Sequence, residues 1–124
     1  MRFRPEQHLR RAKEIRAVRE QGRRIDCRAF MIWWKPRENP GSVTARVCVI
    51  ASTNAVGHAV LRNRAKRRLR EIFRQQQTGV PAGCDLLLIV RAATNHEPMP
   101  ELARRFAEAC ERISAAESAE SGRT

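Results

Sequence analysis

The sequence predicts an α/β fold, a two-layer α+β sandwich in which helices pack on one sheet, because two kinds of segment alternate along it. Some segments place apolar residues every three or four positions among charged ones, as amphipathic helices do, and others are apolar runs of strand length. The chain has 124 residues, 42% of them hydrophobic, which suits one folded domain. We expect that domain over residues 1–113, followed by a frayed polar tail over 114–124.

The first part of the chain predicts a helix and two strands. The helix covers residues 5–21 and is ended by Gly22. Its apolar residues recur every three positions: Leu9, Ala12, Ile15 and Val18. Residues 27–34, CRAFMIWW, form a bulky apolar run and predict a strand. A turn cluster at 35–41 separates it from a β-branched run at 43–51, so we expect these two runs to pair as a hairpin.

The rest of the chain predicts a helix, a strand and a last helix. The first of these helices covers residues 56–77 and ends before Gly79. Residues 85–91, DLLLIVR, read as a strand covered on both faces. A last helix starts at Pro100. If the strands at 43–51 and 85–91 are parallel, the general rule favours a right-handed crossover between them.

Positive charge is concentrated in two short parts of the chain. Lys and Arg number 25 against 13 Asp and Glu, a formal net charge of +12. Residues 1–28 contribute +6 and residues 62–74 another +6, whereas residues 75–124 sum to −2. A charge excess that served only solubility would be spread more evenly, so the pattern indicates a surface that binds a polyanion.

Several function classes are excluded by motifs that the sequence lacks. It contains no GxxxxGKS/T, GxGxxG or GxSxG motif and no CxxC pair. Asp26 and Asp85, its only aspartates, lie in different predicted elements, so we expect no catalytic residue and no metal site on the protein. No apolar run approaches the roughly 20 residues of a membrane span. We therefore expect a cytoplasmic protein without membrane contact.

Residues 61–74, LRNRAKRRLREIFR, place the second charge block on one side of a helix. The apolar stripe, which we expect to be buried, consists of Leu61, Ala65, Leu69, Ile72 and Phe73. Like charges three or four positions apart oppose helix formation, so the opposite, basic arc is expected to meet a polyanion that neutralises it. Arginine dominates this arc and favours bidentate contacts to phosphates and base edges. On the strand at 27–34, an exposed Phe30 or Trp33 could stack an unpaired base.

Residues 56–70, VGHAVLRNRAKRRLR, resemble the Arg-Asn-Arg signature helix of the protein component of bacterial ribonuclease P. The segment 9–22 is similar to the first helix of that family, 27–34 to its first strand, and DLLLIVRAA at 85–93 to its C-terminal third. The resemblance thus covers most of the chain. It implies the order helix, three strands, helix, strand, helix, with a left-handed crossover around the basic helix.

The resemblance also implies a function. A ribonuclease P RNA subunit would hold Mg²⁺ and cleave the phosphodiester that frees the mature 5′ end of tRNA. The protein would bind that RNA and the 5′ leader of precursor tRNA, with no obligate protein partner. Counting Arg68 of the same basic arc, the residues expected to bind RNA are Arg62, Asn63, Arg64, Lys66, Arg67, Arg68 and Arg70. Those expected to line the leader cleft are Ile15, Arg19, Phe30 and Trp33.

A few positions depart from the family pattern. Ile15 and Arg19 stand where aromatic residues are usual, so Trp33 could supply the stacking and Arg19 a phosphate contact. Thr53 and Asn54 stand where many members carry a basic pair. The alternative interpretation is a ribosomal-type RNA-binding protein without a role in cleavage. A helix-turn-helix DNA binder is disfavoured because a strand precedes the basic helix.

Overall fold

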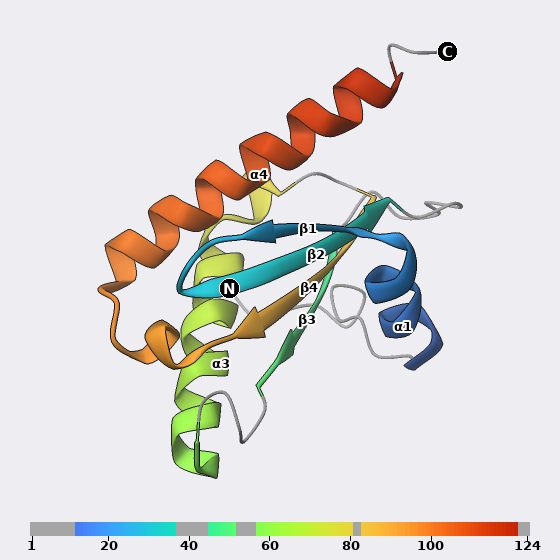
Figure 1. Cartoon of the computed structure of the whole chain (residues 1–124). Coiled ribbons are helices and arrows are strands. Elements are labelled where there is room, and N and C mark those ends of the chain that lie inside the picture. The colour runs from blue at the N-terminus through green and yellow to red at the C-terminus, as the bar shows by residue number, and fades with distance from the viewer. Residues whose placement is uncertain (1–11, 37–44, 52–56, 81–82, 122–124) are drawn as a thin grey trace.

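The computed structural model describes residues 12–36, 45–51, 57–80 and 83–121, in which three helices accompany a four-stranded sheet (Figure 1). Along the chain the elements are α1 (Ala12–Gln21), β1 (Arg23–Asp26), β2 (Phe30–Pro36), β3 (Arg46–Ile50), α3 (Ala59–Gln75), β4 (Cys84–Val90) and α4 (Met99–Ser121). Two short 3-10 helices, η2 (Gln77–Gly79) and η3 (Ala92–Asn95), precede β4 and α4. The α/β class and the order implied by the resemblance are confirmed.

The sheet has the order β1-β2-β4-β3, which differs from the predicted pairing. β2 pairs antiparallel with β4, and β3 pairs parallel with β4 on its other side. The expected hairpin between 27–34 and 43–51 is therefore wrong, because β4 lies between the two strands. All but one of the β4 residues are buried. A strand with apolar side chains on both faces is most stable in the middle of a sheet, where both faces are covered.

The hairpin that does form joins β1 to β2 through the turn at residues 27–29. The residue pattern predicts no strand at β1 because this strand is only four residues long and exposes three of them. Ile25 is its one buried side chain, which is too little for a period-two signal. Only the family resemblance predicted that three strands, rather than two, precede the basic helix.

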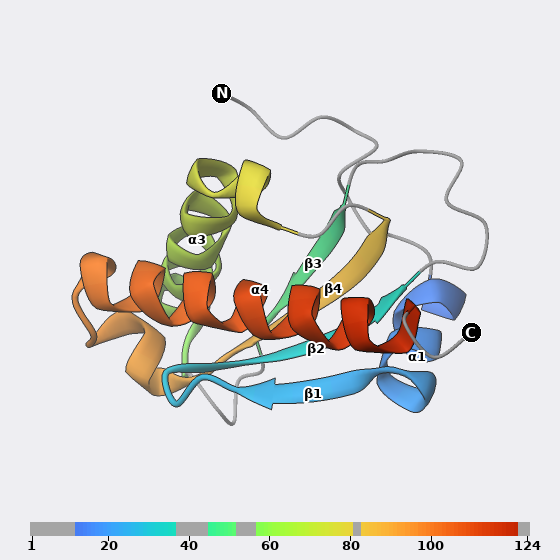
Figure 2. The same cartoon turned by 90° about the horizontal axis from the view of Figure 1, so that it is seen from above.

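The connection from β3 through α3 to β4 joins parallel strands, and it is left-handed (Figures 1 and 2). The right-handed default is therefore wrong here, and the hand implied by the resemblance is confirmed. Side-chain direction gives the physical reason. Val47, Val49 and Leu88 point to the face that α3 covers, whereas Leu87 points to the opposite face, against α1. A right-handed crossover would have placed α3 on the face that α1 occupies.

Two apolar clusters lie on opposite faces of the sheet. The larger one joins the strands to α3 and α4 and contains an edge-to-face pair, Phe73 and Phe106, with ring centroids 6.5 Å apart. The smaller one lies under α1, where Val18 packs against Leu87. α4 crosses over the strands, whereas α1 lies at one end of the sheet (Figure 2). Since α1 covers only part of the second face, some apolar side chains there remain half-exposed.

The C-terminal helix is longer than expected. The tail predicted to fray from Ser114 instead continues α4 as far as Ser121. Its residues include several alanines and glutamates, which have high helix propensity, and this accounts for the continuation. At the other end, the part of the predicted first helix before Ala12 lies outside the described residues. No helix in the described part of the chain is long and apolar enough to cross a membrane.

Gly22 sets the angle between α1 and the sheet, because no side chain fits at this position. A Cβ there would lie 2.3 Å from the carbonyl oxygen of Val18 and 2.6 Å from that of Trp34. We expect Gly22→Ala to lower the free energy of unfolding by about 2–4 kcal/mol, since main chain must move to relieve such a clash. Urea denaturation measures this loss.

Gly79 provides the matched control for this substitution. A Cβ at Gly79 would meet nothing within 4 Å. Gly79→Ala should therefore change the free energy of unfolding by no more than about 0.5 kcal/mol. Equal losses in the two variants would show that the close approach at Gly22 does not restrict the structure.

Candidate nucleic-acid interface

The first three turns of α3 present a cluster of basic side chains to solvent. The buried stripe contains Ala65, Leu69, Ile72 and Phe73, as the sequence predicted. Leu61, expected in the same stripe, is 41% exposed. The first turn of α3 projects past the ends of the strands (Figure 1), away from the sheet that buries the rest of the stripe.

Most of the predicted RNA-binding residues of α3 are accessible. Asn63, Arg64, Arg67 and Arg70 are exposed, and Arg62 and Lys66 are half-buried. We call the five basic members of this group the basic face of α3: Arg62, Arg64, Lys66, Arg67 and Arg70. Within the described residues none of the five forms an ion pair, whereas Arg74, further along the helix, binds Glu71. The basic face is therefore free to meet an external anion.

Arg68 differs from its neighbours because the protein itself uses its guanidinium. Its Nε donates to the carbonyl oxygen of Thr94 at 2.9 Å, and its Nη2 donates to that of Glu97. Burial, with the nearby charge of Arg64, lowers the pKa of Arg68. The inclusion of Arg68 among the accessible RNA contacts is thus not supported by its placement: it anchors the chain around η3 to the side of α3. The sequence offered no signal for this, since both acceptors are main-chain atoms.

The η3 segment also holds the start of α3. The side-chain amide of Asn95 donates to the carbonyl oxygen of Leu61 at 3.0 Å. Two polar atoms next to this contact, Asn95 Oδ1 and Arg62 Nε, are buried without a hydrogen-bond partner among the described residues. The first turn of α3 is thus held by a hydrogen bond to η3, the segment that follows β4.

On the sheet face that α1 covers in part, half-buried apolar side chains form two rows across the strands. One row runs from Trp33 through Leu87 to Cys48, and the next runs from Met31 through Ile89 to Ile50. The half-buried members of these rows, which we call the open sheet face, are Met31, Trp33, Cys48, Ile50 and Ile89. Such a surface can stack or pack the bases of an unpaired strand.

Positive charge borders the open sheet face on both sides. Lys66 and Arg70 lie close enough to Cys48 to act on its thiol, and they oppose the rise in the pKa of Cys48 that burial causes. On the other side, the guanidinium of Arg24 lies 5.8 Å from the centre of the Trp33 ring. Trp33 Nε1 is buried and has no hydrogen-bond partner in the described part of the chain. Basic side chains and half-buried apolar side chains therefore lie side by side.

α1 is tied to the sheet by a network of ion pairs at the end of the open sheet face. Arg46 on β3 donates to both carboxylate oxygens of Asp85 at 2.8 Å and also binds Glu14 of α1. Asp85 is 7% exposed. Hydrogen bonding to Asp85 is the main cause that raises the pKa of Arg46. The position of α1 beside the open sheet face thus depends on a largely buried arginine–carboxylate pair.

The residues predicted for the leader cleft do not all lie together. Ile15 is half-buried and packs beside Val18 and Leu87, close to Trp33. Arg19 is exposed on α1. Phe30, in contrast, is fully buried on the opposite face of the sheet, so its prediction as a cleft residue is wrong.

Strand alternation gives the physical reason for this correction. Successive side chains point to opposite faces, so Phe30 and Trp33, three positions apart, cannot share one. The same rule places Met31 on the face of Trp33, although Met31 was not among the residues predicted for the leader cleft. Cys48, Ile50 and Ile89 were also missed, because only the β3–β4 register brings them beside Trp33.

The comparison with protein families decides the assignment. The family model described as Ribonuclease P matches residues 3–114. The chain belongs to the ribonuclease P protein family. Membership explains the combination of a basic signature helix with a left-handed crossover.

Similar proteins carry the same designation. The chain is 32% identical over 109 residues to the ribonuclease P protein component of Desulfatibacillum aliphaticivorans, covering 88% of this chain and 89% of that protein. It is 38% identical over 98 residues to that of Symbiobacterium thermophilum, covering 79% and 83%. For the protein from Desulfovibrio desulfuricans the match is 37% over 83 residues and spans 62% of its length.

Solved structures of ribonuclease P proteins share the fold. The protein from Thermotoga maritima superposes with a TM-score of 0.73 at 21% identity, covering 85% of this chain and 96% of that one. The protein from Staphylococcus aureus gives 0.71 at 21% identity, covering 87% and 94%. At this level of identity the likeness concerns the fold.

Proposed function

We propose that this chain is the RNA-binding protein subunit of ribonuclease P. Together with a catalytic RNA subunit it would promote endonucleolytic removal of the 5′ leader from precursor tRNA. The observation that carries the proposal is the position of the basic face of α3 next to the open sheet face, so that phosphate-binding and base-stacking groups adjoin. Membership of the ribonuclease P protein family indicates that this surface is part of ribonuclease P.

The two surfaces suit two different RNA segments. The five residues of the basic face of α3 form no ion pair within the described part of the chain, and arginine and lysine bind phosphates, so this face would dock on the ribonuclease P RNA. The open sheet face offers Trp33 and neighbouring apolar side chains, which suit the unpaired bases of a 5′ leader. Arg19 and Arg24 would bind the phosphates of that leader.

The bond-breaking step is assigned to the RNA subunit. The described residues include no group of three or more His, Cys, Asp or Glu side chains that could hold a metal ion. The proposal places Mg²⁺ on the RNA subunit, as the resemblance to the family implies. The contribution of the protein would be electrostatic, because guanidinium groups that neutralise phosphates allow two RNA molecules to approach and the RNA to hold its metal ions at lower Mg²⁺ concentration.

Reconstitution tests the proposed function. The purified chain is mixed with a bacterial ribonuclease P RNA and a precursor tRNA that carries a 5′ leader, at a low Mg²⁺ concentration where the RNA alone is slow. We expect faster cleavage at the mature 5′ end when the protein is present. Cleavage no faster than with RNA alone would contradict the proposal.

Trp33→Ala is expected to remove the preference for substrates with a leader. Base stacking on an aromatic side chain contributes about 1–3 kcal/mol per base, so affinity for a leader-bearing precursor should fall roughly 5- to 100-fold. Affinity for mature tRNA should not change, because that ligand lacks the leader. Binding to both RNAs is compared in the reconstituted complex.

Trp33→Phe is the matched control because it keeps an aromatic ring. It should retain most of the leader preference. If Trp33→Ala lowered affinity for both RNAs equally, Trp33 would be shown to support the fold or the RNA subunit rather than the leader.

A further inference from the structure

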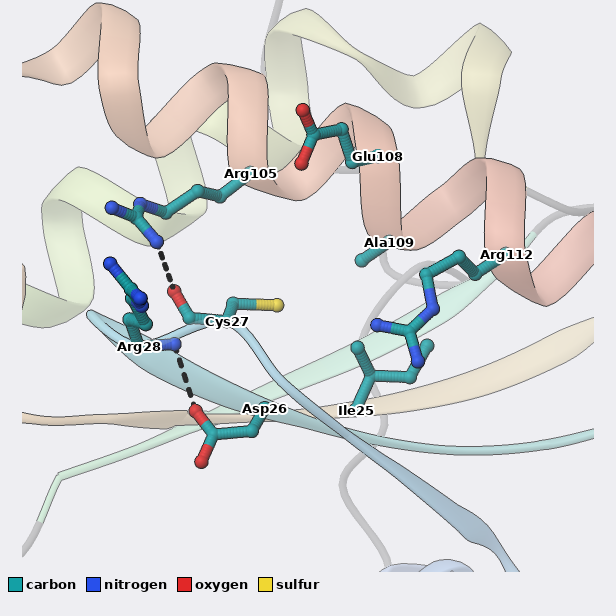
Figure 3. A pocket seen from close by; sticks show the side chains of 8 residues that line it. All are labelled: Ile25, Asp26, Cys27, Arg28, Arg105, Glu108, Ala109 and Arg112. Carbon is teal, nitrogen blue, oxygen red and sulfur yellow. Dashed lines mark hydrogen bonds between the residues drawn. The ribbon is translucent and has the colours of Figure 1, made fainter.

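A pocket of about 170 Å³ lies between the β1–β2 turn and α4, on the opposite face of the sheet from the open sheet face (Figure 3). Its lining consists of Ile25, Asp26, Cys27, Arg28, Arg105, Glu108, Ala109 and Arg112. The four α4 residues are spaced as one helix face, and the small side chain of Ala109 in their middle leaves the space open. Nothing in the proposed function uses this pocket.

Both carboxylates of the lining are already bound by arginines that lie outside it. Asp26 accepts a hydrogen bond from Arg91 at 2.8 Å, which lowers the pKa of Asp26. Glu108 accepts one from Arg104 at 2.6 Å. Each carboxylate of the lining is thus paired with an arginine from outside the pocket.

The three arginines of the lining have N–H groups that make no hydrogen bond within the described residues. Arg28 and Arg112 are exposed and form no ion pair with the residues that the structure describes. Arg105 lies 3.2 Å from Glu101 and donates weakly to the carbonyl oxygen of Cys27 at 3.5 Å. Its Nε is buried and has no hydrogen-bond partner among the described residues. Figure 3 shows Arg28 and Arg105 on one side of the Cys27 side chain and Arg112 on the other.

The backbone at Arg28 supplies an independent observation. Arg28 has φ of 66°, and the Ala29 N–H donates to the Cys27 carbonyl at 2.7 Å, so the three residues form a tight turn with a left-handed centre. Such turns are strained for any residue except glycine. Hydrogen bonds from the Arg28 N–H to Asp26 and from Arg91 to the Arg28 carbonyl hold the turn in place. Keeping an arginine where glycine would fit without strain is typical of a functional position.

We propose that this pocket binds a backbone phosphate of RNA between Arg28 and Arg105, whose side chains lie on the same side of Cys27. The site would give the chain an RNA contact on the side of the molecule opposite the open sheet face, and its assignment to RNA rests on the proposed function. At about 170 Å³ the pocket is large enough to hold a phosphate group. Burial raises the pKa of the Cys27 thiol to about 11, so no thiolate competes with the anion.

The first test follows the backbone amide signals of the full ¹⁵N-labelled chain by NMR while sodium phosphate is added at constant ionic strength. The amides of Cys27, Arg28 and Ala109 should shift and saturate, and the same concentration of sodium chloride should not shift them. If phosphate causes no saturable shift, or if chloride reproduces it, the proposal is overturned.

Arg28→Gly separates binding from folding, because glycine relieves the strained turn while it removes the guanidinium. We expect this variant to melt at or above the wild-type temperature and to bind phosphate at the pocket at least about tenfold more weakly, since charge-assisted hydrogen bonds are lost. Arg105→Gln should weaken binding similarly, and it leaves the residue with the left-handed φ in place. Wild-type phosphate affinity in both variants would overturn the proposal.

A matched control distinguishes this pocket from the basic face of α3. Arg64→Gln combined with Arg67→Gln removes two positive charges elsewhere and should leave the phosphate response of the Cys27, Arg28 and Ala109 amides unchanged. A loss of that response in the control would mean that the shifts report general charge, which contradicts a local site.

A single-stranded RNA oligonucleotide tests the source of the phosphate. It should shift the same amides, and sodium phosphate should compete with it. If inorganic phosphate binds and RNA leaves these signals unmoved, the RNA assignment is overturned. These outcomes are independent of the proposed function, whose failure would appear as absent stimulation of cleavage by the wild-type chain.

Discussion

Replacing Arg64 and Arg67 by alanine is expected to weaken binding to a ribonuclease P RNA by roughly 10- to 100-fold near 0.1 M salt, because each lost phosphate contact removes about one unit of the log–log salt slope. Both side chains are exposed on the basic face of α3 and form no ion pair among the described residues. The slope should therefore flatten by about two units. Filter binding or fluorescence anisotropy over a series of salt concentrations measures both quantities.

Arg68→Ala is the matched control for this experiment. It removes one positive charge from the same helix, against two in the double variant, but the guanidinium of Arg68 is occupied by the carbonyl oxygens of Thr94 and Glu97. We expect it to lower the free energy of unfolding by about 1–3 kcal/mol and to leave the salt slope nearly unchanged. If Arg68→Ala flattened the slope as much as the double variant, the division between RNA contact and structural anchor would be wrong.

Arg46→Ala is expected to cause a large loss of stability. It removes the bidentate partner of Asp85, whose side chain is 10% exposed, and also the contact that joins β3 to Glu14 of α1. Breaking an ion pair that is largely buried typically costs about 3–5 kcal/mol, since the remaining charge stays poorly solvated. Urea denaturation measures the loss, and affinity for leader-bearing precursor should fall with it because α1 borders the open sheet face.

Arg74→Ala provides the comparison for the Arg46 experiment. Arg74 also binds a carboxylate, that of Glu71, but the two side chains are 29% and 39% exposed. Exposed ion pairs contribute little to stability because water screens them, so we expect only a small loss. Equal losses in the two variants would show that burial does not strengthen the Arg46–Asp85 pair.

The helices and the central strand could be predicted because their signals are local. The buried stripe of α3 follows from its three- to four-residue spacing, and the uninterrupted apolar run of β4 follows from burial on both faces. β1 could not be predicted from pattern, since three of its four residues are exposed. The extension of α4 beyond Ser114 was missed because a run of small and charged residues reads equally well as a polar tail.

The candidate interface was predictable on the helix and less so on the sheet. A run of arginines on one arc of α3 identifies a polyanion-binding surface without reference to any other element. The open sheet face, by contrast, is assembled from three strands, and its members become neighbours only through the β2–β4 and β3–β4 registers. Arg68 shows the reverse case, in which a residue of the correct type for RNA binding is used by the fold.

The sequence by itself determined the fold class, the charged face of α3 and the family, because each depends on residue types at short and regular spacing. Tertiary structure alone decided the strand order, the residues beside Trp33, the anchoring role of Arg68 and the pocket between Arg28 and α4. Those features depend on contacts between residues far apart in the chain, such as Arg28 and Arg105. Local periodicity carries no information about which distant elements pack together, and packing is what places these side chains.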